Sequence, residues 1–329
     1  MKREGINIVW LKRDIRSQDH EPLLRAEQAG IPYHIIYLFE PTLVEYADTS
    51  LRHLQFVYHS ILTINKTLKP FNRSVEVFYG EAIDVFEYLT SSCNVKTLFS
   101  YRESGIHITW QRDKKINLLC KKCQIIWQES QRDGILRGIK NRDDWNKQWH
   151  KKMHTPVLQN KYTISKDVCL EHSFIMPSKL EYQLKEYPSH YQPAGEKNAW
   201  RYLKSFTNQR GFNYQRHISK PAESRKSCSR LSPYLAWGNM SVKQAFQFIG
   251  THPNGTRNSK AFSAMLTRLH WHCHFIQKFE MECRYETECI NSGYELLPHE
   301  KNEAFIKAWK TGTTGYPLID ACMRAVETT

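Results

Sequence analysis

The sequence predicts two domains: an α/β domain with a doubly wound parallel sheet of about five strands, followed by an all-α domain. In the first 150 residues, short β-branched or aromatic runs alternate with segments of helical periodicity. After about residue 194 only helical periodicity remains. A chain of 329 residues is also long for a single hydrophobic core, which favours two domains.

Five runs of the first domain are predicted strands, because each is short and rich in β-branched or aromatic residues. Alternation of strands with helices favours parallel pairing, and ligands of such sheets bind beyond the carboxyl ends of the strands. The helix expected at Leu51–Leu68 places its apolar residues on one stripe. The predicted strands are Ile6–Leu11, Tyr33–Phe39, Ser74–Gly80, Val95–Tyr101 and Cys123–Glu129.

The second part of the chain is punctuated by prolines and then becomes helical. Periodicity fades over 151–193, which predicts a linker between domains 1–150 and 194–329. Ser241 is expected to cap a helix that ends at Gly250, and Pro317 is expected to begin another. An apolar stripe still runs at Val326, so the helical domain is expected to be incomplete at its C-terminus.

Composition indicates a cytoplasmic protein without a membrane segment. No run approaches the roughly 18 apolar residues of a membrane helix, and nine cysteines show no disulfide framework. Residues 1–150 hold 22 basic and 18 acidic side chains, whereas residues 151–329 hold 25 and 15, giving net charges of +4 and +10. The second half would therefore dock a polyanion, or else its charge only serves solubility.

Three segments carry a family resemblance. The stretch Ser227–Gly238 contains hydroxyls that suit either a helix cap or the binding of phosphate oxygens. It resembles the flavin-binding T-S-R-L-S-P-Y-L-x-x-G stretch of photolyases and cryptochromes. Val9–Arg16 is similar to the family's V-W-F-R-R-D-L-R opening, and Trp309–Arg324 is similar to its W-x-x-G-x-T-G-[YF]-P-[IL]-[IV]-D-A-x-M-R stretch.

The resemblance implies an N-terminal α/β domain and a helical domain that holds FAD in a folded shape. Tyr214 matches the family's flavin-phosphate tyrosine, seven residues before Pro221, and Cys228 stands where threonine is usual. Glu103, Arg112 and an antenna chromophore of unidentified kind belong to the same expectation. The implied flavin-binding residues are Tyr214, Cys228, Ser229, Arg230, Leu231, Ser232 and Met265.

The helix around Trp271 is the expected lesion-binding element. Trp271 lies opposite the apolar stripe that begins at Phe262, which suits base stacking, although a helix buried on both sides would give the same pattern. The family has E-L-x-W-R-[DE]-F-[YF] here, so Arg268 replaces its substrate-contacting glutamate and His272 its arginine. The implied DNA-binding residues are Arg268, Trp271, His272 and Phe275.

No metal site is expected. His270 and His274 are four residues apart, but no carboxylate or cysteine with suitable spacing accompanies them. His299 stands where the family has the outermost tryptophan of its electron-transfer chain.

Two functions stay open. The first is a DNA photolyase, in which reduced FAD absorbs blue light and passes an electron to a flipped-out pyrimidine dimer; its partner would be damaged or single-stranded DNA, bound by a monomer. The second is a cryptochrome photoreceptor with the same flavin and no repair. The changes at Arg268 and His272 favour the cryptochrome, and the basic second half favours the enzyme.

Overall fold

The computed structural model describes residues 4–166, 170–298 and 300–328. The chain separates into two compact units. The first comprises Met1–Glu186 and Ala194–Cys283, and the second comprises Tyr187–Pro193 and Arg284–Thr329.

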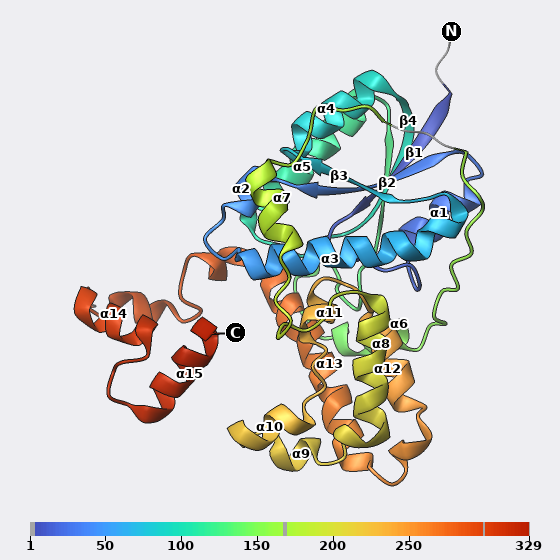
Figure 1. The fold of residues 1–329 in the computed structure, drawn as a ribbon. Helices are drawn as coiled ribbons and strands as arrows, with labels where there is room; N and C mark the ends of the chain where they lie inside the picture. Colours follow the sequence, from blue (N-terminus) through green and yellow to red (C-terminus); the bar gives the residue numbers. More distant parts are fainter. Residues whose placement is uncertain (1–3, 167–169, 299, 329) are drawn as a thin grey trace. The chain divides into compact units, whose positions relative to one another are not determined.

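The first unit contains the predicted five-stranded parallel sheet, which confirms the α/β fold class (Figure 1). The strand order is β3-β2-β1-β4-β5, so the direction of winding reverses between β1 and β4. At such a switch point the loops diverge and leave a crevice beyond the carboxyl ends of the strands. The strands are β1 Gly5–Leu11, β2 Tyr33–Phe39, β3 Val75–Tyr79, β4 Asn94–Tyr101 and β5 Ile126–Ser130.

Helices cover both faces of the sheet because consecutive strand residues point to opposite sides. Val9 and Leu11 of β1 belong to the apolar core beneath α1, α3 and α7, whereas Ile8 and Trp10 belong to the core beneath α4 and α5. The helices of this part are α1 Glu21–Gln28, α2 Pro41–Val44, α3 Leu51–Leu68, the 3₁₀ turn η1 Lys69–Phe71, α4 Ala82–Ser92, α5 His107–Lys122, α6 Trp145–Met153 and α7 Ser178–Lys185.

Helix α3 has the bounds that its periodicity predicts. Its first turn is capped by Ser50, whose hydroxyl accepts a hydrogen bond from the backbone N–H of His53. Within the proline-rich stretch 151–193, α7 forms a helix whose Leu184 is fully buried in the same core as α3. Part of that stretch is therefore packed onto the α/β sheet.

The rest of the first unit is helical, in agreement with the predicted second fold class. Ser241 caps α12 with a full capping box: its hydroxyl accepts from the N–H of Gln244, whose side chain accepts from the N–H of Ser241. The elements are α8 Glu196–Ser205, the π-helical turn η2 Phe206–Arg210, α9 Tyr214–His217, α10 Pro221–Ser227, α11 Ser232–Ala236, α12 Val242–Gly250, η3 Pro253–Gly255 and α13 Ser259–Met281.

The second unit is also helical. Asn302 caps α14 by accepting hydrogen bonds from two backbone N–H groups, and Pro317 begins α15 as predicted. Across the described parts of both units, we find no helix that combines the length and the apolar character of a membrane span. The elements are η4 Cys283–Glu286, η5 Ser292–Leu296, α14 Glu303–Thr311 and α15 Pro317–Thr328.

Candidate functional site

The Ser-rich stretch forms a short loop between α10 and α11. Cys228 is extended, and Arg230 adopts a left-handed backbone with φ 58°. A residue other than glycine is uncommon in this region, and such backbone outliers concentrate at ligand-binding sites. Leu231 is buried and anchors the loop in the core, whereas Ser229 is half-buried and Ser232 is exposed. The two hydroxyls are thus held at the surface by a fixed backbone.

Arg210 holds this loop from the preceding π-helical turn. Its Nη1 donates to the carbonyl oxygen of Cys228, and its Nη2 donates to the carbonyl oxygens of Ser229 at 3.2 Å and Tyr202 at 2.8 Å. A guanidinium fork that satisfies several carbonyls fixes their orientation. Sequence reasoning did not find Arg210, because a contact between an arginine and carbonyls 18 residues away leaves no motif.

Tyr214 connects the loop to the long helix α13. Its ring is buried against Phe206, with ring centroids 5.5 Å apart, and Arg268 lies close enough to its phenol to act on the ionisation of that group. Burial raises the pKa of Tyr214 above its ordinary value, although Arg268 lowers it in part. The phenol therefore keeps its proton at neutral pH and can donate a hydrogen bond to a phosphate oxygen. Cys228 of the loop lies close enough to act electrostatically on Tyr214.

Arg268 also reaches the predicted base-stacking residue. Its guanidinium lies 4.3 Å from the ring centroid of Trp271, and Phe275 meets the same ring at 6.4 Å and nearly edge-on. Trp271 is 44% exposed and Phe275 is 61% exposed, so neither belongs to the core. An exposed aromatic pair beside a cation suits stacking on a base next to a phosphate. The structure thus brings Tyr214, Arg268, Trp271 and Phe275 together along one face of α13.

Two further predicted residues lie elsewhere on α13. Met265 is buried on the apolar stripe, one turn before Leu269. His272 points inward rather than toward Trp271: its charged neighbours are Asp133 and Arg132, and burial lowers the pKa of its imidazole. Among the described residues, nothing bonds to Nε2 of His272. His272 is thus a neutral, half-buried side chain outside the Trp271 cluster.

The remaining histidines of α13 pack against α6. Nε2 of His270 lies 2.6 Å from Oδ1 of Asn146, and His274 bonds with Arg142. Within the ranges that the structure describes, no group of three or more metal-binding side chains is present. His299 lies outside the described residues.

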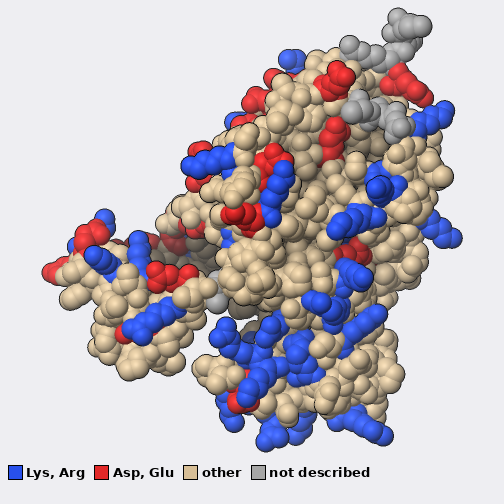
Figure 2. All heavy atoms as spheres, viewed as in Figure 1, with Lys and Arg blue, Asp and Glu red and all other residues tan. Residues whose placement is uncertain are grey.

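Basic side chains gather beside the loop and Tyr214. Figure 2 shows Lys and Arg side chains concentrated over the helical part of the first unit. Residues 201–230 contain eight basic side chains and a single carboxylate, Glu223. We call the exposed members the basic face. They are Arg201, Lys204, Arg216, Lys220, Arg225, Lys226 and Arg230.

The opening motif binds directly to the Ser-rich motif. The N–H of Ile15 donates to the carbonyl oxygen of Trp237 at 3.1 Å, and Arg16 donates to that of Gly238 at 3.2 Å. Gly238 has φ 69°, and an added Cβ would lie 2.2 Å from the carbonyl oxygen of Arg13, so only glycine fits. The two sequence motifs therefore form one structural unit, although the bonded residues Arg16 and Gly238 are 222 positions apart.

Asp19, three residues after Arg16, connects the α/β part of the first unit to its helical part through buried charged and polar side chains. Its carboxylate accepts from the hydroxyl of Ser241 at 2.6 Å and pairs with Lys243 at 2.8 Å. All three side chains are buried. Asp19, in the charged loop after β1, thus supports the helical part.

A cavity of about 320 Å³ lies at the carboxyl ends of β1, β2 and β4. Glu103, from the loop after β4, and Thr109 and Arg112, from α5, line it on one side. Trp237 lines it from the Ser-rich stretch. Its volume is that of a small-molecule pocket, and its place follows from the reversal of strand order. Trp110 does not line it and lies exposed on α5, beneath Lys114 at 3.4 Å.

Arg112 organises the charges at this cavity. It bonds with Glu40 at 2.7 Å, with Glu103 at 2.6 Å and with Asp113 at 2.8 Å, and Asp113 also pairs with Lys12 at 2.9 Å. We call these five residues the buried ion network, since each side chain is at most 10% exposed.

Two carboxylates of the network respond to burial in opposite ways. Burial raises the pKa of Glu103, but Arg112, Lys12 and Arg13 together lower it by more than burial raises it. The net pKa is therefore well below its ordinary value. For Glu40, burial outweighs Arg112 and the net pKa is raised. Glu103 has three cations within reach and Glu40 mainly one, which explains the difference.

The C-terminal motif makes a compact turn within the second unit. Asp320 accepts hydrogen bonds from the N–H and the hydroxyl of Thr314, at 2.8 and 2.6 Å, and from the N–H of Gly315 at 3.1 Å. Gly312 ends α14 with φ 62°, where a Cβ would lie 2.7 Å from the carbonyl oxygen of Asp320. The spacing of the motif thus has a local structural cause, because these glycines and the aspartate close one turn.

The donor set of the first unit fits the diphosphate of the flavin that the resemblance implies. Ser229, Ser232 and the protonated Tyr214 offer hydroxyl donors, and Arg268 offers a guanidinium near Tyr214. Phosphate oxygens accept strong hydrogen bonds from both kinds of group.

Comparison with known families and proteins identifies the family to which the chain is similar. Residues 7–137 match the family model "DNA photolyase", and residues 265–329 match "FAD binding domain of DNA photolyase". The chain is 21% identical to cryptochrome DASH of Synechocystis over 98% of its length and 70% of that protein's. It is 25% identical to a deoxyribodipyrimidine photo-lyase of Buchnera aphidicola, over 97% of its length and 69% of that protein's.

Solved structures share the fold. An archaeal photolyase from Sulfolobus tokodaii, described with two FAD molecules, aligns over 98% of this chain and 71% of its own, with 22% identity and a TM-score of 0.76. A class III photolyase from Agrobacterium tumefaciens aligns over 99% and 69%, with 18% identity and a TM-score of 0.81. With both family models matched in order on the predicted fold, the chain belongs to the photolyase/cryptochrome family and carries its FAD-binding domain sequence.

Proposed function

We propose that the protein is a light-driven, FAD-dependent DNA photolyase that repairs pyrimidine dimers. The observation that carries the proposal is the continuous path from Tyr214 through Arg268 to Trp271, with the basic face beside it. This path joins the residues implied in flavin binding to those implied in lesion binding. The domains proposed for this division of labour remain 1–150 and 194–329, joined by 151–193.

In this proposal each part of the site has one task. Tyr214, Ser229 and Ser232 bind the flavin diphosphate, with Arg210 keeping the loop in place. Bound FAD in its reduced form would supply the absorption of blue light and the electron for dimer cleavage. The protein contributes position and electrostatics.

The DNA side of the site follows from exposed residues. The ring of Trp271 would stack on a flipped-out base, and Arg268, which lies against that ring and near Tyr214, would contact the adjoining phosphate. Flipping a damaged base costs less than flipping a paired one, which favours lesions over intact DNA. The basic face would neutralise backbone phosphates.

The cavity lined by Glu103, Arg112 and Trp237 is the place we propose for an antenna chromophore. It lies at the switch point of the sheet, and Trp237 from the Ser-rich stretch forms part of its wall. A chromophore there would lie close to the loop implied in flavin binding, because Trp237 is part of the same motif.

A cryptochrome without repair activity is the second candidate, and Arg268 is the observation that favours it. The family's glutamate at this position contacts the substrate, whereas Arg268 here is a cation committed to Tyr214 and Trp271. Under this alternative the cofactor site is the same and only the lesion chemistry is missing.

One assay separates these functions. The purified protein is examined for flavin absorbance and then illuminated with an oligonucleotide that contains a single thymine dimer. Flavin bands with restored thymines support the photolyase, flavin bands without repair support the cryptochrome, and the absence of flavin bands contradicts both. The same incubation without light serves as the control for thermal reversal.

A further inference from the structure

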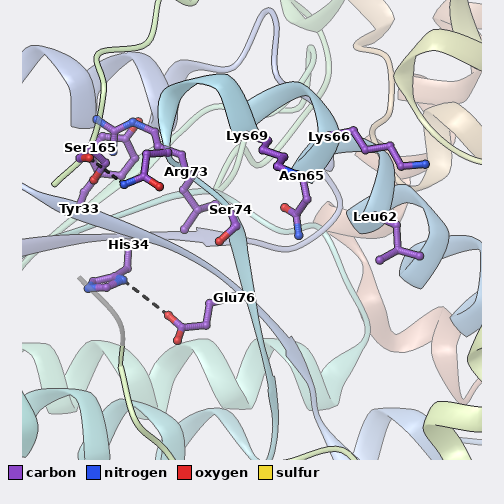
Figure 3. Close-up of a pocket in the computed structure, with 12 residues that line it drawn as sticks. Tyr33, His34, Leu62, Asn65, Lys66, Lys69, Arg73, Ser74, Glu76 and Ser165 are labelled. Atoms are coloured by element: carbon purple, nitrogen blue, oxygen red, sulfur yellow. Dashed lines mark hydrogen bonds and ion pairs between the residues drawn. The ribbon is translucent and has the colours of Figure 1, made fainter. Parts of the chain in front are cut away.

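The largest of the cavities described here lies at the other end of the sheet from the proposed antenna pocket. It has a volume of about 540 Å³ and lies between the C-terminal end of α3 and the first residues of β2 and β3 (Figure 3). None of the residues implied in flavin or lesion binding lines it. Its volume falls in the range of small-molecule sites.

Cations outnumber carboxylates around this cavity. Lys66 lies in the last turn of α3, Lys69 follows that helix directly, and Arg73 precedes β3, whereas Glu76 is the one carboxylate among the lining residues. In the part of the chain that the structure describes, neither Lys66 nor Lys69 makes an ion pair, and both are exposed. Their charge is therefore available to a ligand.

Arg73 is held rigidly at the wall. Its Nε donates to the carbonyl oxygen of Thr163 at 3.1 Å, its Nη2 pairs with Glu27 at 2.9 Å, and its guanidinium stacks 4.0 Å from the ring centroid of Tyr33. The side chain is only 7% exposed, yet its Nη1 has no partner among the described residues. An unsatisfied buried donor of a charged group destabilises the protein unless another group bonds with it.

The opposite wall carries different chemistry. Figure 3 shows Leu62, Lys66 and Lys69 along one side of the cavity, with His34 and Glu76 across from them. Nδ1 of His34 lies 3.6 Å from Oε2 of Glu76. A carboxylate on the wall facing the lysines is an acceptor for hydroxyl groups, and the apolar side chain of Leu62 offers a surface for a less polar part.

We propose that this cavity binds a small phosphorylated molecule of mononucleotide size. Lys66 and Lys69 contact the phosphoryl oxygens, Arg73 offers its unpartnered Nη1 as a fixed donor at the wall, and Glu76 accepts a hydrogen bond from a hydroxyl of the ligand. Lysines act as point charges on phosphate, and a preorganised arginine adds to the attraction without losing much conformational freedom. The proposal goes beyond the light-driven function and does not depend on it.

Isothermal titration calorimetry of the chain with AMP, ribose 5-phosphate and adenosine tests the site. We expect AMP or ribose 5-phosphate to bind with a stoichiometry of one, and adenosine to bind at least about tenfold more weakly because it lacks the phosphoryl group. The double substitution Lys66→Gln with Lys69→Gln should lower the affinity for the phosphorylated probes by about tenfold or more. Both lysines are exposed, so folding should be preserved, and circular dichroism checks this.

Two further variants make the test specific. Lys121→Gln with Lys122→Gln removes the same charge from exposed positions at the end of α5 and should leave binding unchanged. Leu62→Trp narrows the cavity without altering its charge and should weaken the binding of AMP.

Several outcomes would overturn the proposal. They are no binding of either phosphorylated probe, equal loss in both lysine pairs, or inorganic phosphate binding as tightly as AMP. Flavin absorbance of the same samples is a separate measurement, so a failure here is distinguishable from a failure of the photolyase proposal.

Discussion

The charged side chains of the buried ion network are paired and buried, whereas those of the basic face are mostly exposed and have few carboxylates near them in the sequence. In the network, Arg112 and Lys12 bond with three carboxylates, and no side chain is more than 10% exposed. In residues 201–230, eight basic side chains accompany a single carboxylate, and seven of the eight are exposed. The same residue types are thus buried and paired in one region and largely exposed to solvent in the other.

The difference has a physical cause. Buried charges are tolerated only when they are paired and hydrogen-bonded, so removing one partner leaves the others uncompensated. Exposed charges contribute little to folding, because water screens them, but they attract phosphates over distances of about a Debye length. The two regions should therefore respond in opposite ways to mutation, pH and salt.

The largest effect is expected from Arg112→Ala. The substitution leaves Glu40, Glu103 and Asp113 without their shared cation and should lower the free energy of unfolding by about 3–5 kcal/mol. Lys204→Ala on the basic face is the matched control and should change stability by less than about 0.5 kcal/mol. Urea denaturation measures both, and equal losses would erase the distinction between the two regions.

Glu103→Gln should give the next largest effect and make stability less dependent on pH. Because the pKa of Glu103 in the folded protein is below its ordinary value of 4.5, the carboxylate stabilises the fold fully above that pH. This stability is lost as the pH falls below 4.5, when the unfolded chain binds the proton more readily. The variant should be less stable by about 1–3 kcal/mol at neutral pH.

Thermal or urea unfolding from pH 7 to pH 3 measures the gap between the wild type and Glu103→Gln. We expect the gap to narrow below pH 4.5 and to stay constant above pH 6. A gap that is the same across the whole range would mean that Glu103 acts only through packing.

Trp271→Ala should weaken binding of a single-stranded thymine oligonucleotide by about tenfold, since stacking on an aromatic side chain contributes about 1–3 kcal/mol per base. Flavin content should stay unchanged. Trp110→Ala is a close control, because both rings are 44% exposed and both carry a cation over the ring. Fluorescence anisotropy gives the affinities, and loss of flavin in Trp271→Ala would place that ring in the cofactor site instead.

The smallest effect is expected from removing two charges of the basic face. For Lys204→Gln with Lys220→Gln, the slope of log K against log salt concentration should decrease by about 1.4 for single-stranded DNA, or roughly 0.7 per lost contact. Lys121→Gln with Lys122→Gln again removes the same charge elsewhere. If both pairs change the slope equally, DNA does not select the basic face.

Much of the fold followed from local patterns. Four of the five predicted strands both begin and end within one residue of the observed bounds, and α3 agrees at both ends, because periodicity and a serine cap act locally. The start of β5 was predicted three residues too early. Cys123 ends the preceding helix and Gln124 adopts a left-handed backbone with φ 57°, so the chain turns before the strand begins.

The candidate site was less accessible from sequence. Motif spacing pointed to Tyr214 and Ser229, and helical geometry pointed to the exposure of Trp271. His272 was expected beside Trp271, yet one residue along a helix turns the side chain by about 100°, and it faces Asp133 instead. Arg210 could not be foreseen at all, since its partners are carbonyl groups that every residue possesses.

The junction at Asp19 also bears on how the chain is made. Its buried carboxylate meets Ser241, 222 residues later, and at a synthesis rate of about 5–20 residues per second that partner emerges roughly 10–45 s after Asp19 itself. During this interval the carboxylate of Asp19 in the nascent α/β part is solvated, and the loop after β1 has not yet packed against the helical part. Formation of the contacts of Asp19 with Ser241 and Lys243 therefore waits for translation to reach α12, and pausing before that point would prolong exposure of the unfinished surface.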